Sequence, residues 1–562
     1  MVNKSEVVVI GGVAAGPKAA ATLARRKPEL KITLFQKEKD ISYSTCGLPY
    51  FASGDVNSFE ELTLTSYGVV RDTDFFRKTK GFEVITRAEV ASVNRNRKTI
   101  TYKLLDTDET LEHGYDRLVM ATGAVPNAPA FPVVDSPKII HFTRPEDAFR
   151  FRENVQRGQI GRAVIIGGGF IGCEVAEATG TMWGVETTLI EKEEQLLPYV
   201  LDPEMAAIAE RELVRQDVTV HTGTTVEKIE ENADGELVVT LVGNESVTTD
   251  FVFLCLGVHP NVELARDCGL AVGETGAIRV DEHLRTSDPD IYAGGDCIQS
   301  RSLVTGKPLY IPMGSLANRH GRIIAENIAG QEAVFQGVTG AFLVKVYDVN
   351  VGSAGITQRT AEGMGIASHS VWASFVDKPD YYPESRNLSL KMTYAVDDGR
   401  LLGLQAVGAG DICRRIDVFS VHLKAGAKVA DLLDFEHGYA PPYSEALDPL
   451  HHLAALAIAR EKGLNIVSPA VSMGGNSIWL DVREPEEVSG NPWPLSDDER
   501  KKKYISIPLN DLRDNLDKLD PGKKIILICR RGPRSYQASL ILKQAGFSNV
   551  HVIGGGTTAA LS

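Results

Sequence analysis

Two runs of consecutive apolar residues, at positions 7–10 and 164–166, are each followed at once by a cluster of glycines. An uninterrupted apolar run of this kind is typical of a parallel strand buried on both faces. The glycines predict a tight turn into a helix, where backbone N–H groups meet a pyrophosphate at the helix N-terminus. The chain thus contains a weak internal repeat of a dinucleotide-binding unit, and two copies are a far stronger indication than one.

The first copy departs from the usual glycine pattern, whereas the second copy is complete. In the first, Val13 replaces the central glycine and the next strand ends in Phe35 and Gln36, where an acidic residue is usual. Gln36 can still hydrogen-bond a ribose hydroxyl. In the second, the strand at 187–190 leads into Glu191, whose carboxylate would accept hydrogen bonds from a ribose 2′-hydroxyl and repel a 2′-phosphate. This predicts a preference for NADH over NADPH.

Two further segments belong to a nucleotide-binding domain that the second unit interrupts. Residues 118–126 predict a strand that closes on a turn of small residues. Residues 286–296 predict a strand that ends at Asp296, whose carboxylate is suited to hold a polyol hydroxyl. Each alone is also compatible with an ordinary strand and glycine turn. In series with both glycine loops, they indicate one split domain.

From about residue 330 the pattern changes to short strand-like runs, such as 341–347 and 388–394, which predict a mixed α+β domain. That domain ends near a proline-bearing loop at 439–444, and a helical connector follows at 450–463. The last part of the chain alternates strands with helical stretches, which predicts a small parallel α/β domain. Its expected strands are residues 478–483, 504–508, 524–529 and 549–553.

Length and composition limit the classes of protein that this chain can belong to. At 562 residues it is long enough for roughly three to four domains. A net charge of −14 disfavours nucleic acid and acidic membranes as general partners. Seven scattered cysteines suit a reducing cytoplasm, and no cysteine or histidine group has metal-ligand spacing. No apolar stretch reaches the roughly 18 residues of a membrane span.

Cys46 follows the first glycine loop and stands alone. A dithiol redox site would place a second cysteine about five positions later, but that position holds Phe51. A single thiol must store an electron pair as a mixed disulfide, a persulfide or a sulfenic acid. Cys173 and Cys255 are expected to be structural. Cys297, next to Asp296, is a weaker rival for the redox role.

Cys529 closes a predicted strand and opens a helix through a six-residue loop that ends at Arg534. Such a loop can turn successive N–H groups inward and form an anion nest around a terminal sulfur. Arg534 is expected to face this nest, and Arg530 and Arg531 add positive potential, which favours the thiolate. The alternative is a buried cysteine at a strand end.

On these residues, the chain resembles the flavin-dependent pyridine nucleotide–disulfide oxidoreductases, in the coenzyme A-disulfide reductase branch that carries a C-terminal rhodanese domain. The resemblance implies an α/β fold with two Rossmann-like domains, for FAD and NAD, an α+β dimerisation domain and a rhodanese domain. The expected boundaries are 1–125 and 255–328 for FAD, 126–254 for NAD, 329–450 for dimerisation, 451–470 for a linker and 471–562 for rhodanese.

The resemblance also implies roles for individual residues. Cys46 would be the redox nucleophile, and Cys529 with Arg534 would form the persulfide loop near Asp481 and Arg483. Tyr381, or alternatively Tyr382, and Tyr439 would reach into the active site of a partner subunit, which predicts a homodimer. The FAD site is expected to comprise Gly11, Gly12, Ala14, Ala15, Gly16, Gln36, Lys37, Ala121, Thr122, Gly123, Gly295 and Asp296. The NAD site is expected to comprise Gly167, Gly169, Phe170, Ile171, Gly172, Glu191 and Gly257.

Coenzyme A is expected to contact a second group of residues. The resemblance points to Lys18, Thr22, Arg25, Ser42, Thr45, Asn318 and Arg319. Lys18, Thr22 and Arg25 are spaced by four and three residues, so they share one helix face that is suited to phosphates. The alternative for this face is a solvated basic helix flank.

The predicted activity is NADH-driven reduction of coenzyme A persulfide, polysulfide or disulfide. NADH would reduce FAD, the flavin would reduce oxidised Cys46, and Cys529 would carry sulfane sulfur. One alternative is an NADH peroxidase or oxidase that uses a Cys46 sulfenic acid, although such peroxidases place a histidine where this chain has Ala14. Another is a sulfurtransferase or redox sensor on a flavin scaffold, against which the complete second glycine loop argues.

Overall fold

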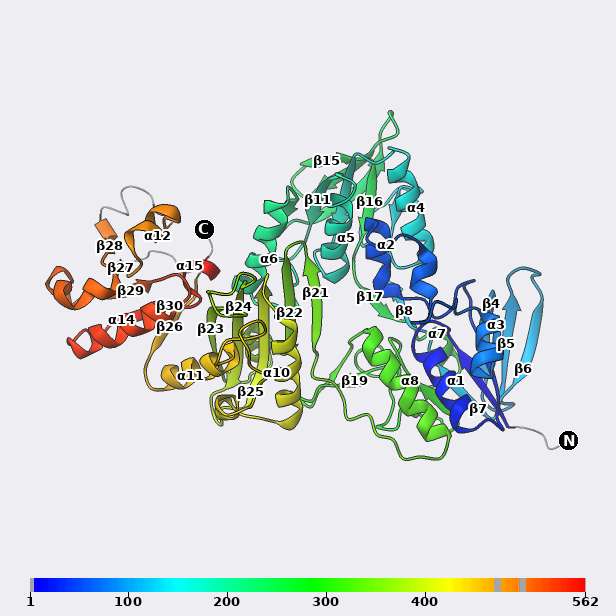
Figure 1. The fold of residues 1–562 in the computed structure, drawn as a ribbon. Coiled ribbons are helices and arrows are strands. Elements are labelled where there is room, and N and C mark those ends of the chain that lie inside the picture. Colours follow the sequence, from blue (N-terminus) through cyan, green and yellow to red (C-terminus); the bar gives the residue numbers. More distant parts are fainter. Residues whose placement is uncertain (1–4, 470–476, 494, 496–501, 561–562) are drawn as a thin grey trace. The chain divides into compact units, whose positions relative to one another are not determined.

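The computed structural model describes residues 5–469, 477–493, 495 and 502–560. The chain divides into two compact units (Figure 1). The first comprises residues 1–190 and 225–338, and the second comprises residues 191–224 and 339–562. The strong apolar runs in the sequence form central strands of the parallel sheets in these units.

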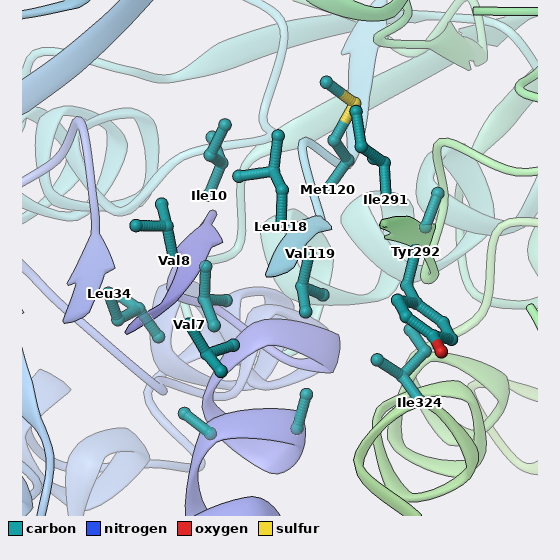
Figure 2. Packing of buried hydrophobic residues seen from close by; sticks show 14 of the residues in the cluster. Val7, Val8, Ile10, Leu34, Leu118, Val119, Met120, Ile291, Tyr292 and Ile324 are labelled. Atoms are coloured by element: carbon teal, nitrogen blue, oxygen red, sulfur yellow. The ribbon is translucent and has the colours of Figure 1, made fainter. Parts of the chain in front are cut away.

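The N-terminal sheet has the strand order β18-β7-β1-β2-β3. Its parallel strands are β18 (Ile291–Ala293), β7 (Arg117–Met120), β1 (Glu6–Ile10), β2 (Lys31–Phe35) and β3 (Glu83–Ile85). Val7, Val8 and Leu118 are among its fully buried side chains (Figure 2). Helices α1 (Ala15–Arg26) and α8 (Gly314–Ile328) pack closely, since a Cβ on Gly321 would lie 2.4 Å from the Ala15 carbonyl oxygen.

A second parallel sheet contains the strands β11 (Glu186–Ile190), β10 (Arg162–Ile166), β16 (Phe251–Leu254) and β9 (Ile139–Ile140). Helices α4 (Pro145–Gln156) and α5 (Phe170–Gly180) belong to this part of the chain. Two antiparallel meanders were not predicted from the sequence. They are β4 (Ala88–Asn94), β5 (Thr99–Leu104) and β6 (Thr110–Gly114), and β13 (Val226–Glu231), β14 (Leu237–Leu241) and β15 (Ser246–Thr249).

The second unit contains an antiparallel sheet with the order β21-β22-β25-β24-β23. Its strands are β21 (Phe342–Val346), β22 (Val349–Gly355), β25 (Leu401–Gly408), β24 (Asn387–Ala395) and β23 (Ser368–Val376). Helices α6 (Pro203–Arg215), α10 (Cys413–Ala425) and α11 (Pro449–Glu461) belong to the same unit. The predicted α+β character and the predicted helix at 450–463 are both confirmed.

The C-terminal sheet has the order β26-β30-β29-β27-β28, and all its pairings are parallel. Four of its strands match the prediction: β27 (Ser477–Asp481), β28 (Tyr504–Ser506), β29 (Lys524–Ile528) and β30 (Val550–Ile553). The fifth, β26 (Asn465–Val467), lies in the stretch expected to be a linker. Helices α12 (Pro485–Gly490), α14 (Pro533–Gln544) and α15 (Gly556–Ala559) accompany the sheet. The predicted fold class is therefore confirmed. In the described part of the chain, no helix has the length and apolar character of a membrane span.

Candidate functional site

Three chain segments predicted to hold FAD meet at one edge of the N-terminal sheet. Strands β1, β7 and β18 are parallel neighbours, and each ends where a small-residue turn begins. A Cβ on Gly11 would lie 2.0 Å from the Ala121 carbonyl oxygen, and one on Gly16 would lie 1.9 Å from the Gly11 oxygen. A Cβ on Gly295 would lie 3.2 Å from the Cβ of Ala15. Such close backbone approach at the carboxyl ends of parallel strands fits a dinucleotide pyrophosphate.

Gln36 holds the glycine loop closed instead of presenting a free amide. Its Oε1 accepts a hydrogen bond from the Gly12 N–H at 2.8 Å. Its Nε2 donates to Glu38 Oε2 at 2.9 Å and to the Asp40 carbonyl oxygen at 3.3 Å. The acidic group next to the loop is therefore Glu38, two positions beyond the expected place. Lys37 pairs with Glu89 at 2.6 Å.

The other two FAD segments are fixed by internal hydrogen bonds. Thr122 Oγ1 donates to the Asn261 carbonyl oxygen at 2.6 Å. The Gly295 N–H donates to His320 Nδ1 at 3.1 Å, and burial lowers the pKa of His320 to about 4, so the imidazole is neutral and able to accept. Burial raises the pKa of Asp296. His320, which sequence reasoning missed, thus supports the turn that carries Asp296.

The second glycine loop repeats the close packing of the first. A Cβ on Gly167 would lie 2.3 Å from the Cys255 carbonyl oxygen, and one on Gly172 would lie 1.9 Å from the Gly167 oxygen. At Gly169, just before α5, no heavy atom lies within 4 Å of the added Cβ, which leaves room for a ligand to approach the backbone. Phe170 is exposed at the start of α5. Gly257 adopts a positive φ of 78°.

Glu191 directly follows β11, whose neighbour β10 leads into the second glycine loop. Its side chain is buried, and Oε1 accepts a hydrogen bond from the Glu193 N–H at 2.8 Å. The carboxylate is thus held in a fixed orientation at the end of the strand.

Cys46 lies in a 3-10 turn (Thr45–Gly47) that leads into α2 (Leu48–Ser53), and it is an exposed free cysteine. A Cβ on Gly47 would lie 2.4 Å from Leu62 Cδ2, so the turn is packed on its inner side. Partial burial raises the pKa of the Cys46 thiol, and the negative charges of Glu174 and Asp296 raise it further. The turn thus brings Cys46 into the electrostatic range of residues from both glycine-loop domains.

Cys297, the rival to Cys46, and Cys173, which was expected to be structural, are both buried. Cys297 is buried, and its Sγ lies 3.4 Å from the Gly294 carbonyl oxygen. Cys173 is buried, with its Sγ 3.8 Å from the Gly168 carbonyl oxygen. Both environments suit packing behind a turn rather than reaction with a substrate.

A basic cavity of about 360 Å³ lies between α1 and α8. It is lined by Lys18, Thr22, Arg25, Arg26, Arg322 and Glu326. Three of the predicted coenzyme A contacts therefore share one cavity, and α8 adds Arg322, which sequence reasoning missed. The excess of positive charge suits phosphate groups.

The other predicted coenzyme A residues lie outside this lining. Ser42 has a φ of +52°, and its Oγ accepts from Arg71 Nη1 at 3.5 Å. Thr45 begins the turn that holds Cys46. Asn318 donates to the Gly314 carbonyl oxygen at 2.9 Å, and the Arg319 guanidinium lies 5.3 Å from the centre of the Phe335 ring.

The Cys529 loop directs one backbone N–H at the sulfur, which is the first element of the predicted anion nest. The Gly532 N–H donates to Cys529 Sγ at 3.0 Å, and Gly532 adopts a φ of +131° that favours glycine. The guanidinium of Arg534 binds both oxygens of Glu487, at 2.5 and 2.8 Å. This pairing holds the pKa of Glu487 at about 2, so the carboxylate stays charged and orients Arg534.

Asp481 and Arg483 form a buried network beside this loop. Arg483 Nη2 donates to Asp481 Oδ2 at 2.7 Å, and the Tyr504 hydroxyl donates to the same oxygen at 2.7 Å. The pair therefore supports the end of β27 and does not present a free charge.

Tyr381 and Tyr439 both lie on the surface of the second unit. Their exposed fractions are 74% and 53%. Tyr382 instead lies 5.9 Å below the Lys378 ammonium. Exposed tyrosines are suited to contact a second chain. Within the described residues, no group of three or more histidine, cysteine or carboxylate side chains is arranged to hold a metal ion.

Comparisons with known proteins identify the families to which the parts of the chain are similar. Residues 5–313 match the family model of the pyridine nucleotide-disulphide oxidoreductases. Residues 342–451 match the dimerisation domain of the same family, and residues 471–561 match the rhodanese-like domain.

Three relatives illustrate the similarity. An NAD(P)H sulfur oxidoreductase (CoA-dependent) from Pyrococcus abyssi is 36% identical, over 80% of this chain and 98% of its own length. An NAD(P)H coenzyme A polysulfide/persulfide reductase from Pyrococcus horikoshii is 34% identical over the same shares. The solved structure of an NAD-dependent persulfide reductase from A. fulgidus superposes with a TM-score of 0.94 at 38% identity, covering 99% of this chain and 100% of that one.

The charge of Glu174 yields a testable prediction about Cys46. Burial raises the pKa of Glu174 to about 7, so the carboxylate is ionised mainly above that pH and there disfavours the Cys46 thiolate. Glu174→Gln removes this repulsion, and we expect the pKa of Cys46 to fall. The measurement is the pH dependence of Cys46 alkylation by iodoacetamide, with Cys46→Ser as the blank.

Glu186→Gln is the matched control, because it removes an equal charge from the exposed start of β11. An unchanged alkylation profile in Glu174→Gln, or an equal shift in the control, would contradict the assigned electrostatic coupling.

Proposed function

The chain belongs to the pyridine nucleotide-disulphide oxidoreductases and carries a rhodanese-like domain, and we propose that it is an NADH-dependent flavoenzyme that reduces coenzyme A persulfide and polysulfide. The observation that carries the proposal is the presence of two thiols in separate settings, one exposed (Cys46) and one buried at a strand end with a backbone N–H donor (Cys529). Cys46 is exposed beside both glycine-loop domains, and Cys529 accepts an N–H bond inside the predicted anion nest. A reductase for plain disulfides would not need the second thiol.

In the proposed reaction, bound FAD passes electrons from NADH toward Cys46. The glycine loops beginning at Gly11 and Gly167 hold the two dinucleotides, and Asp296 binds the flavin side chain. The proposed domain limits follow the sequence: FAD binding by 1–125 and 255–328, NAD binding by 126–254, dimerisation by 329–450, a linker at 451–470, and rhodanese activity by 471–562, with β26 of the linker adding an edge strand to the C-terminal sheet. The basic cavity on α1 and α8 binds the phosphates of coenzyme A.

The Cys46 thiolate attacks the sulfane sulfur of the substrate, and Cys529 transfers sulfane sulfur to or from coenzyme A. Names of relatives support this substrate class, since the Pyrococcus horikoshii protein is called a coenzyme A polysulfide/persulfide reductase. A peroxidase reaction is less well supported, because Ala14 offers no imidazole at the N-terminus of α1.

Two cysteine variants test the proposal. Cys46→Ser should abolish sulfur reduction with every sulfur substrate, while NADH still bleaches the bound flavin. Cys529→Ser should lose thiosulfate:cyanide sulfurtransferase activity and most polysulfide reduction, because no carrier remains to load sulfur onto coenzyme A. Reduction of preformed coenzyme A persulfide or disulfide should survive, since these molecules enter the flavin site themselves.

The measurement is steady-state NADH oxidation across these substrates, with peroxide and oxygen as alternative acceptors. Retention of polysulfide reduction by Cys46→Ser would refute the nucleophile. If the Cys529→Ser enzyme kept all its activities, sulfane sulfur transfer by Cys529 would be refuted, and only the reduction of plain disulfides would remain of the proposal.

The proposed homodimer can be tested by subunit mixing. If Tyr381 and Tyr439 serve Cys46 of the other subunit, Cys46→Ser and a Tyr381→Phe/Tyr439→Phe variant are each inactive alone. Random exchange of subunits should restore about a quarter of wild-type activity, because half the dimers then contain one complete site. Mass photometry monitors the dimers. Persistent inactivity of the mixture would contradict the shared site.

Glu191→Ala tests the preference for NADH. Its buried carboxylate would lose both its bond to the ribose 2′-hydroxyl and its repulsion of a 2′-phosphate. A contact of this kind is typically worth about 1–3 kcal/mol, so we expect the NADH/NADPH ratio of kcat/KM to fall at least about fivefold. Lys192→Ala is the control at the neighbouring position. If it changes the NADH/NADPH ratio of kcat/KM more than Glu191→Ala does, Lys192 and not Glu191 determines the cofactor preference.

A further inference from the structure

The Cys529 loop and the Tyr381 segment are joined by a direct ion pair in the second unit. Arg531, two residues after Cys529, places Nη2 2.6 Å from Oδ2 of Asp380, which directly precedes Tyr381. The Ser374 N–H, from β23, donates to the Arg531 carbonyl oxygen at 3.3 Å. The backbone of Arg531 is therefore attached to β23, and its side chain to the segment that follows β23 and carries Tyr381.

A glycine turn supports this attachment from the other side. A Cβ on Gly554 would lie 2.2 Å from the Trp372 Nε1, and one on Gly555 would lie 3.1 Å from the Ser374 Oγ. A Cβ on Gly556 would lie 2.3 Å from the Cys529 carbonyl oxygen. The turn at 554–556 thus fits between β23 and the Cys529 loop, and only glycine leaves enough space.

The segment that carries Tyr439 lies within reach of the same arginine. Burial and the charge of Asp380 raise the pKa of Glu445, whereas Arg531 lowers it. The Glu445 carbonyl oxygen lies 3.2 Å from His437 Nε2, which closes the loop around Tyr439. Arg531 therefore pairs directly with the Tyr381 segment through Asp380 and lies within electrostatic range of Glu445 in the segment that follows Tyr439.

We propose that Asp380 and Arg531 are positioning residues that hold the Cys529 persulfide beside the tyrosine segments. In this position its outer sulfur passes to a substrate thiolate, which then carries the sulfur to the flavin site. This inference rests on the proposed function. In the transfer, a thiolate RS⁻ attacks the outer sulfur of Cys529–S–S⁻. The S–S bond to Cys529 breaks, a new S–S bond gives R–S–S⁻, and Cys529 leaves as its thiolate. No electrons from NADH are consumed until the persulfide reaches Cys46.

The ion pair contributes orientation more than stability. Asp380 is 65% exposed in its side chain, and exposed pairs add little to folding. Removing the pair should therefore leave the Cys529 nest intact, since the Gly532 N–H and the Arg534–Glu487 pair do not involve Asp380. Loss of the ion pair should then impair the delivery of sulfur from Cys529 without impairing the loading of sulfur onto Cys529.

A double-mutant cycle on the full-length holoenzyme tests the proposal, using Asp380→Asn, Arg531→Gln and the combined variant. Each single variant should reduce kcat/KM for NADH-driven polysulfide reduction by about fivefold or more, and the combined variant should fall no further, as expected for two groups that act as one pair. Coenzyme A disulfide reduction and the thermal unfolding midpoint should stay near wild type in every variant. Thiosulfate:cyanide sulfurtransferase activity should stay near wild type in Asp380→Asn, which leaves the positive charge of Arg531 beside Cys529 in place. Arg531→Lys, which keeps the charge, should recover most of the loss.

Arg513→Gln is the matched control, because Arg513 is an exposed arginine of the same domain, on the 3-10 helix Leu509–Lys518. Additive effects of the two substitutions, unchanged polysulfide reduction, or parallel loss of sulfurtransferase activity in Asp380→Asn would each overturn the positioning role. Failure of the proposed function is distinct: Cys529→Ser would then leave polysulfide reduction intact in the same assay.

Discussion

The close approach of backbone segments at Gly11 is the constraint on which the candidate site depends. Strand β1 turns so tightly against β7 that a Cβ at Gly11 would lie 2.0 Å from the Ala121 carbonyl oxygen. Because the carboxyl ends of parallel strands share one sheet edge, this turn brings the segments around Ala121 and Gly295 together. A side chain at Gly11 would separate them, and the same constraint recurs at Gly167 against Cys255.

The two thiols lie in opposite electrostatic surroundings, which suits two different tasks. Around Cys46 the nearby charges are the carboxylates of Glu174 and Asp296, which favour the protonated thiol. Around Cys529, a backbone N–H points at the sulfur and the guanidinium of Arg534 is oriented by Glu487. A carrier of sulfane sulfur holds an anionic terminal sulfur when loaded, and a loop that aims a backbone N–H at the sulfur is suited to bind it. The thiol at Cys46 is instead suited to become a thiolate only when redox chemistry delivers electrons to it.

Sequence reasoning predicted the four kinds of domain and both glycine loops, because apolar runs and glycines are local signals. It could not predict which partner a polar side chain would choose. Gln36 was expected to bind a ribose hydroxyl, but in the structure its side-chain amide hydrogen-bonds to Gly12 of the glycine loop and to Glu38. The sequence does not show the second of these bonds, which is what places Glu38 beside Gln36. Arg322 joined the basic cavity because α8 packs against α1, a contact between helices almost 300 residues apart in the sequence.

The attachment of the rhodanese loop illustrates why such contacts escape prediction. Covalent fusion raises the effective concentration of one domain at the other, but it does not set their orientation. Here Gly554 lies so close to Trp372 that an added Cβ would fall 2.2 Å from Nε1, and the Trp372 side chain is buried, so this contact contributes apolar burial. The Asp380–Arg531 ion pair contributes only about 0–1 kcal/mol to folding stability, and its role is to orient the Cys529 loop. Stability and orientation are thus assigned to different residues, so the orientation can be altered without loss of the fold.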